Sequence, residues 1–230
     1  MTQIYEDRSF TFRDYLNKTL VIMCIGLSIS AISTFVFGNM ILNVLYSLGI
    51  VGLLAFVGLE LGVAFFFNFR LRQMSKTTAW ICYVVYAFLT GISLSSLVMF
   101  YTPGSVLFAF ISTAVLFGCM AIIGHTTNLD LTRFSSLMFA GLIGIIVTTL
   151  LNVFIFHSST LDMMITFVSM LIFLGIIAYD MQMLRNYYSS SFSDAQMGEK
   201  MMIFGAFQLY LDFINLFMDI LKYFGKRRDD

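Results

Sequence analysis

The segment QLYLDFINLFMD, residues 208–219, decides the fold, because it places polar side chains at helical spacing inside an apolar run. With about 100° between successive residues of a helix, Gln208, Asp212, Asn215 and Asp219 fall within an arc of roughly 60°. An aspartate near the middle of a membrane-spanning helix costs about 2.5 to 3.5 kcal/mol on insertion scales. Lipid is therefore excluded as the neighbour of Asp212, and we expect a polar partner, a proton or water there.

The composition places the chain among integral membrane proteins. Of its 230 residues, 59% are hydrophobic and 11% are charged, against about 25% charged residues in soluble domains. The 13 basic and 13 acidic residues cancel, so no electrostatic attraction to nucleic acid is expected. Cys24, Cys82 and Cys119 each stand alone in an apolar run. That spacing argues against a disulfide framework or a zinc site, and we expect no cofactor.

Seven apolar runs are long enough, at about 17 to 25 residues each, to cross a bilayer. The predicted spans are residues 19–37, 41–67, 79–101, 105–124, 134–156, 162–183 and 202–222. The connections between them are short. The prediction is therefore an all-α integral membrane protein with one transmembrane domain, 19–222, between an N-terminal arm, 1–18, and a charged tail, 223–230.

The distribution of Lys and Arg near the span ends predicts the orientation. Basic residues occur in the N-terminal arm and in the second, fourth and sixth connections, but not in the first, third and fifth. The N-terminus is therefore expected on the cytoplasmic side. An odd number of spans then puts the basic C-terminal tail on the side opposite the cytoplasm, although basic residues near span ends favour the cytoplasmic side. Either the last segment enters and returns, or earlier spans fix the orientation and the tail is carried across; we favour the second explanation.

Small residues inside the spans are expected to let helices approach closely. Candidates for this packing role are Gly58 and Gly62, which match the GxxxG spacing, Gly91, and Gly141 with Gly144.

Four acidic residues lie at membrane depth: Glu60, Asp180, Asp212 and Asp219. Asp219 comes three residues before Lys222, and an interfacial carboxylate that either snorkels or pairs is the expected interpretation. Asp212 lies about 15 Å inside its segment, at 1.5 Å per residue, which favours a functional role. Asp180 is nearer the cytoplasmic end. Its depth matches that of Asp212 only if the helices tilt or the 184–201 connection dips into the membrane.

A contact between Asp180 and Asp212 would have a definite chemistry, because two carboxylates at one site cannot both ionise cheaply. One proton shared between the helices would act as a latch, and its loss would open an oxygen-lined gap suited to Ca²⁺, for which the two carboxylates would be transient ligands. Arg70 and Arg72 are both eligible to compete for the same carboxylate. The residues predicted to line the ion pathway are Glu60, Gln208, Asn215 and Asp219.

Two stretches resemble the Bax-inhibitor-type membrane family: YDMQ, residues 179–182, and LYLDFINLF, residues 209–217. The stretch TGISLS, residues 90–95, fits the same family. The resemblance implies six helices around a central seventh and a pH-sensitive calcium leak. The carboxylates matching Asp180 and Asp212 would form the latch of this leak. Met181 departs from the family pattern, which has threonine after Tyr-Asp.

The resemblance also implies a location and other roles. The chain is similar to bacterial inner-membrane members of the family that associate with a membrane-bound AAA protease. The alternative function is therefore a regulatory binding protein of such a protease, which it would contact through the N-terminal arm. Two aspartates on adjacent spans also resemble an intramembrane aspartyl protease. The Leu-Tyr-Leu before Asp212 disfavours this, because a Gly-x-Gly turn is needed there. We expect a monomer that contacts lipid, protons and calcium, and no catalytic residues.

Overall fold

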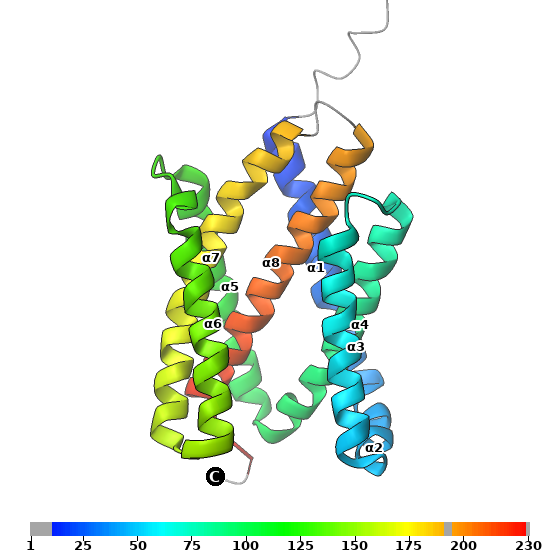
Figure 1. The fold of residues 1–230 in the computed structure, drawn as a ribbon, viewed down its shortest axis with the longest axis vertical. Coiled ribbons are helices and arrows are strands. Elements are labelled where there is room, and N and C mark those ends of the chain that lie inside the picture. Colours follow the sequence, from blue (N-terminus) through cyan, green and yellow to red (C-terminus); the bar gives the residue numbers. More distant parts are fainter. Residues whose placement is uncertain (1–10, 191–194, 229–230) are drawn as a thin grey trace, which may run out of the picture. The chain divides into compact units, whose positions relative to one another are not determined.

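The computed structural model describes residues 11–190 and 195–228. Within these ranges the chain is helical, and seven helices are long and apolar enough to cross a membrane (Figure 1). The all-α prediction with seven candidate spans is thereby confirmed. The elements are α1 (Phe12–Val36), α2 (Gly38–Ser47), α3 (Gly49–Arg70), α4 (Lys76–Phe100), α5 (Pro103–Thr126), η1 (Leu131–Phe134), α6 (Ser135–Leu151), η2 (Asn152–Phe156), α7 (Ser159–Ser190) and α8 (Ala195–Phe224).

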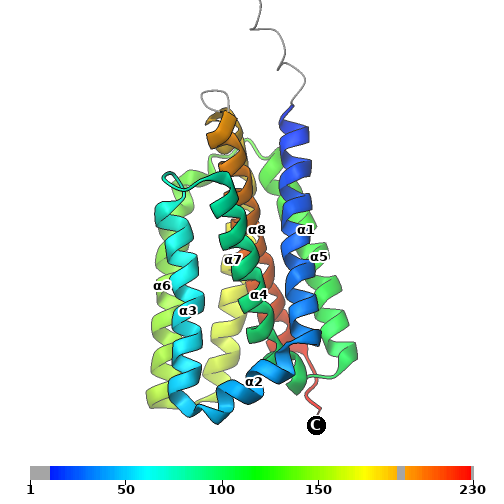
Figure 2. The same ribbon diagram turned by 90° about the vertical axis from the view of Figure 1, so that its right-hand side faces the viewer.

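The second predicted span, 41–67, was wrong at its start. The apolar run is divided into α2 and α3, and Gly49 takes a left-handed backbone conformation with φ of 66° at the break. The ten residues of α2 reach only about 15 Å, half of a hydrocarbon core. This short helix lies obliquely between the ends of α1 and α3 (Figure 2), and Gly49–Arg70 is the spanning segment.

The connection predicted at 184–201 is largely helical. The helix α7 continues to Ser190 and α8 begins at Ala195, while residues 191–194 lie outside the described residues. Both helices therefore extend well past the apolar runs that predicted them. Asp180 is consequently about 15 Å from the end of α7, and Asp212 is about 25 Å from the start of α8.

Helix starts follow local chemistry. Thr11 and Asp14 form a capping box at α1, in which the Asp14 backbone N–H donates to Thr11 Oγ1 at 3.2 Å and the Thr11 N–H donates to the Asp14 carboxylate at 3.0 Å. These bonds satisfy backbone donors that a helix cannot pair internally. At α5, Thr102 is the cap and Pro103 occupies the first turn, where its missing N–H is harmless.

The helices pack as two units, and α7 and α8 contribute to both. The first unit comprises Met1–Met99 and Leu184–Tyr210, and the second comprises Phe100–Met183 and Leu211–Asp230.

In the first unit, α1 and α4 lie in close contact. Hydroxyls of α1 donate to carbonyls of α4 at 2.7 Å each, from Ser30 to Ala87, from Ser33 to Phe88 and from Thr34 to Gly91. Gly91 permits this approach, because a Cβ there would overlap the backbone of Ser30. The packing role predicted for Gly91 is confirmed. A Cβ added at Gly58 or Gly62 would meet nothing within 4 Å, so the GxxxG pair makes no such contact within the described chain.

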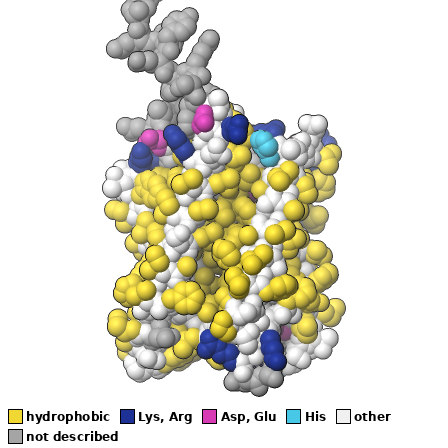
Figure 3. All heavy atoms as spheres, turned by 180° about the vertical axis from the view of Figure 1, so that it is seen from behind, with side chains coloured by type: hydrophobic (Ala, Val, Ile, Leu, Met, Phe, Trp, Pro, Cys, Tyr) yellow, Lys and Arg dark blue, Asp and Glu magenta, His cyan; other side chains and the backbone are white. Residues whose placement is uncertain are grey.

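The apolar surface and the burial of α8 fit a membrane protein. On the face drawn in Figure 3, hydrophobic side chains cover the middle of the helices and charged ones gather toward their ends. In the most apolar stretch of α8, 72% of the residues are buried, against 6% for the span Leu131–Phe156. The polar-striped helix is thus the most buried of the candidate spans, as expected for an inner helix.

The helix ends bear on the topology. In the first unit, Lys76 forms an ion pair with Glu199 at 2.8 Å, so the α3–α4 connection meets the start of α8. In the second unit, Arg227 forms a β-bridge with Tyr101, next to the α4–α5 connection. Because α8 is one continuous helix, the alternative in which the last segment enters and returns was wrong. The cytoplasmic position of the N-terminus stays a prediction.

Candidate functional site

Asp180 on α7 and Asp212 on α8 meet in the second unit. Their carboxyl groups are close enough to share a hydrogen bond, and the two residues are only 7% and 5% exposed. Oδ2 of Asp212 is buried and has no hydrogen-bond partner among the described residues. A hydrogen bond between two carboxyl groups requires a proton on one of them, because an ionised carboxylate only accepts.

The residues that follow the two aspartates in the sequence are apolar and buried. Phe213, after Asp212, packs against Phe110 and Phe117 of α5 with ring centroids 5.6 and 5.8 Å away. Met181, after Asp180, is 3% exposed. Such surroundings penalise charge, so the site favours one shared proton over two separate negative charges.

Two further polar contacts continue along the same two helices in the second unit. Ser169 lies beside the Asp219 carboxyl, and Lys222 forms an ion pair with Asp162 at 2.6 Å, with side chains 39% and 35% exposed. We call this row of three contacts the α7–α8 seam. The ion pair of Lys222 is thus with Asp162, and the interfacial role of Asp219 stays a prediction. Oδ2 of Asp219 is buried and unpaired among the described residues.

Two stripe residues have local or separate partners. The amide of Asn215 donates to the Leu211 carbonyl of its own helix at 2.9 Å. In the first unit, Tyr187 Oη donates to Gln208 Oε1 at 2.8 Å. The predicted roles of Asn215 and Gln208 in an ion pathway stay predictions.

Glu60 on α3 is held by α4 in the first unit. Thr90 donates to Glu60 Oε1 at 2.8 Å, and Ser93 donates to Oε2 at 2.7 Å. Tyr210 on α8 lies beside Thr90, and its hydroxyl lies 2.7 Å from Ser30 Oγ. Hydroxyl groups of α1, α4 and α8 thus gather near the carboxylate. In the sequence, TGISLS at 90–95 carried the hydroxyls, but nothing in it indicated Glu60 as their partner.

Comparison with known proteins shows the family of this chain. A family model described as inhibitor of apoptosis-promoting Bax1 matches residues 12–229. The chain belongs to this Bax-inhibitor family. It is 36% identical over 217 residues to an uncharacterized protein of Borreliella burgdorferi, covering 94% of this chain and 93% of the relative. It is 35% identical over 219 residues to the Rickettsia prowazekii protein RP147, with 94% and 91% covered. With the inner membrane protein YbhL of Escherichia coli it shares 36% identity over 170 residues, 74% of this chain and 72% of YbhL.

Two arginines follow Glu60 along the chain, Arg70 and Arg72. Arg70 is exposed, and its guanidinium donates to Gln73 Oε1 at 2.6 Å. Arg72 is also exposed, and its carbonyl accepts from Lys200 Nζ at 3.1 Å. Both lie in the first unit, whereas Asp180 lies in the second. A latch between either arginine and Asp180 stays a prediction.

A resident metal site of three or more His, Cys, Asp or Glu side chains is not found among the described residues. The Asp180–Asp212 pair offers two carboxyl groups, fewer than the about six to eight oxygen ligands that Ca²⁺ takes. A Ca²⁺ ion at the pair would therefore keep most of its water. The pair fits a passing ion better than a stored one.

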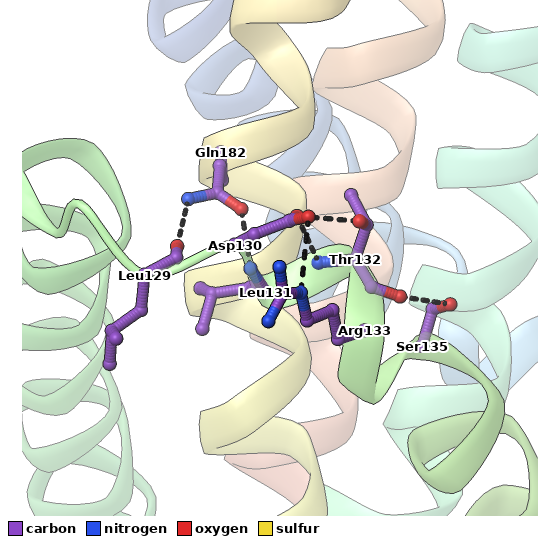
Figure 4. Close-up of polar contacts among 7 residues, drawn as sticks. All are labelled: Leu129, Asp130, Leu131, Thr132, Arg133, Ser135 and Gln182. Carbon is purple, nitrogen blue, oxygen red and sulfur yellow. Dashed lines mark hydrogen bonds and ion pairs between the residues drawn. The ribbon is translucent and has the colours of Figure 1, made fainter.

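Gln182, one turn of α7 away from Ala178, is a contact residue that the sequence reasoning missed. Its amide bonds the backbone of the α5–α6 connection on both sides of Asp130 (Figure 4). The segment YDMQ at 179–182 contained this residue, but an amide near a helix end is typical of a solvated position. The spacing gave no sign of a specific partner.

Proposed function

We propose that the chain is a proton-gated cation leak of the bacterial inner membrane, with Ca²⁺ as the permeating ion. The buried, hydrogen-bonded carboxyl pair of Asp180 and Asp212 is the observation that carries the proposal. The inner membrane is inferred from the name of the YbhL relative.

The gate works by charge repulsion between two helices. With one proton on the pair, the hydrogen bond joins α7 to α8. Loss of that proton leaves two negative charges, and two unit charges about 4 Å apart repel by about 4 kcal/mol at an effective dielectric constant of 20. This energy is comparable to that of several interhelical hydrogen bonds. Raising the pH therefore favours separation of α7 and α8 at the pair.

The seam supplies oxygen atoms for the ion once the helices separate. Asp219 and Ser169 lie on the same α7–α8 seam as the pair, and Ca²⁺ prefers oxygen ligands in flexible arrangements. Carboxylates and water would share its coordination in passage. The role of Glu60 in an ion pathway stays a prediction; its two oxygens are held by Thr90 and Ser93 in the first unit.

The test is a calcium flux measurement in vesicles that contain the purified full-length chain, over a range of pH. The wild type should pass more Ca²⁺ as the pH rises. Asp212→Asn should keep the flux low at every pH, because an amide can still bond Asp180 and cannot ionise. Glu199→Gln, which neutralises an exposed carboxylate of the first unit, is the matched control and should keep the wild-type profile. A wild-type flux equal to that of empty vesicles at every pH would refute the proposal.

Two alternatives stay predictions. Regulation of a membrane-bound AAA protease depends on the N-terminal arm, of which residues 1–10 lie outside the described residues. Deleting residues 1–12 would then abolish the effect on the protease and leave ion flux intact. An intramembrane aspartyl protease needs an accessible carboxylate, whereas Asp212 is 5% exposed on an unbroken helix. Cleavage of a transmembrane peptide that is lost on Asp180→Asn would favour that alternative.

A further inference from the structure

Gln182 joins α7 to the backbone of the connection between α5 and α6. Its Nε2 donates to the Leu129 carbonyl at 2.8 Å, and its Oε1 accepts from the Leu131 N–H at 2.8 Å (Figure 4). Both functions of one amide are thus used on one short segment, in the way a strand pairs with its neighbour. Two hydrogen bonds to one backbone fix direction as well as distance.

The connection is rigid enough to serve as an anchor. Asp130 Oδ1 accepts from the Thr132 N–H at 3.1 Å and from the Thr132 hydroxyl at 2.5 Å. Arg133 Nε lies 3.8 Å from Asp130 Oδ2. These contacts begin η1 and hold the backbone between Leu129 and Leu131 in a turn, so the two groups bonded by Gln182 have fixed positions.

A second contact on the same face of α7 also holds this helix against α5. Gly124 of α5 lies against Ala178 so closely that a Cβ would overlap its carbonyl oxygen. Ala178 and Gln182 are four residues apart and share a helix face. Asp180, two residues from each, lies about 160° to 200° around the helix. The side of α7 fixed by α5 and its connection is therefore opposite the side that carries Asp180 to Asp212.

We propose that Gln182 is a positioning residue that sets the rotation of α7 and so holds Asp180 against Asp212. A carboxyl group about 5 to 6 Å from the helix axis moves by roughly 2 Å when the helix turns by 20°. That displacement exceeds the tolerance of a hydrogen bond. Only the effect of this positioning on ion flux rests on the proposed function.

The test compares Gln182→Met with Ser189→Ala in the full-length chain in lipid nanodiscs. Methionine keeps the length of the side chain and removes both hydrogen bonds. Ser189 is exposed on the same helix, and its hydroxyl bonds only its own helix, at the Arg185 carbonyl. Amide exchange at Leu131 should accelerate roughly 5- to 10-fold in Gln182→Met and stay unchanged in Ser189→Ala.

The carboxyl pair is followed separately by infrared difference spectroscopy. Bands that disappear in both Asp180→Asn and Asp212→Asn belong to the pair. These bands should shift in Gln182→Met and keep their frequency in Ser189→Ala. Gln182→Glu retains the acceptor for the Leu131 N–H and loses the donor to the Leu129 carbonyl, so it should give an intermediate shift of the pair bands. If Gln182→Met does not fold, Gln182→Glu provides the test of the positioning role.

Unchanged pair bands in a folded Gln182 variant would overturn the inference, and so would unchanged exchange at Leu131. Refutation of the proposed calcium leak is distinguishable from these two outcomes. If the wild type passes no Ca²⁺ but the pair bands still shift with Gln182, the leak is refuted and the positioning role stands. If flux exists and its pH profile moves in Gln182→Met but not in Ser189→Ala, both are supported.

Discussion

Replacing Gly91 with alanine is expected to destabilise the chain, because this glycine lets α1 and α4 touch. A Cβ at Gly91 would lie 2.7 Å from Ser33 Cβ and 2.8 Å from Ser30 Cα, and it would also overlap the Ser30 carbonyl oxygen. Two of these three atoms belong to the backbone. No change of rotamer removes the overlap, so the helices themselves have to move apart.

The magnitude follows from what the separation disturbs. Three interhelical hydrogen bonds, from Ser30, Ser33 and Thr34, cross this contact at 2.7 Å, and such bonds in membrane proteins average about 0.6 kcal/mol each. Overpacking adds about 1 to 3 kcal/mol. The better helix propensity of alanine offsets about 1 kcal/mol. The net expectation for Gly91→Ala is a loss of about 2 to 4 kcal/mol in the free energy of unfolding.

The assay is reversible unfolding in mixed detergent micelles, followed by the fluorescence of the single tryptophan, Trp80, on α4. Gly58→Ala is the matched control, since nothing lies within 4 Å of a Cβ added there. It should leave the stability unchanged or raise it by up to about 1 kcal/mol. If Gly91→Ala is as stable as Gly58→Ala, the α1–α4 contact is looser than described and the reasoning is refuted.

Three other predictions concern polar contacts. Lys222→Met should lower the free energy of unfolding by less than about 1 kcal/mol, because the half-exposed pair with Asp162 is worth little; a double-mutant cycle with Asp162→Asn measures the coupling. Thr90→Val should destabilise by about 1 to 2 kcal/mol, since it leaves Glu60 Oε1 without its donor, and the effect should shrink in a Glu60→Gln background. Hydrogen bonds from Thr132 hold the pKa of the Asp130 carboxyl below its ordinary value of 3.8. The turn that Asp130 caps should therefore be intact above pH 3.8 and loosen as the pH falls through the lowered pKa. Amide exchange at Thr132 measures this loosening, and Asp130→Asn should abolish its pH dependence.

The sequence was sufficient for features that depend on length and hydrophobicity. Seven long apolar runs predict seven spans, because a bilayer of fixed thickness has to be crossed by helices. It also located the buried carboxyls, since a charge cannot be left in lipid and Asp212 lies deep in its run. The start of the second span was missed, because the apolar run continues through Gly49 and hydrophobicity does not record a change of chain direction.

Partners between helices were harder to predict than the helices themselves. The sequence places Lys222 three residues after Asp219 and gives no sign that its ion pair is with Asp162 on another helix. Gly58 and Gly62 matched a packing motif that Gly91 does not match, although Gly91 makes the contact. Spacing along one helix gives the face on which a residue lies. Which neighbour meets that face depends on tertiary packing, and a single sequence does not encode it in any local pattern.

The burial of α8 has a consequence for how the protein is made. This helix has the lowest mean hydropathy of the seven candidate spans, 1.5, against values up to 2.5, and it is the most buried of them. A segment with aspartates in its middle enters lipid poorly alone, but the ribosome releases α8 only after the other six have been synthesised. Its polar stripe can then be received by helices that are already in the membrane, so the order of synthesis protects the residues that lipid would reject.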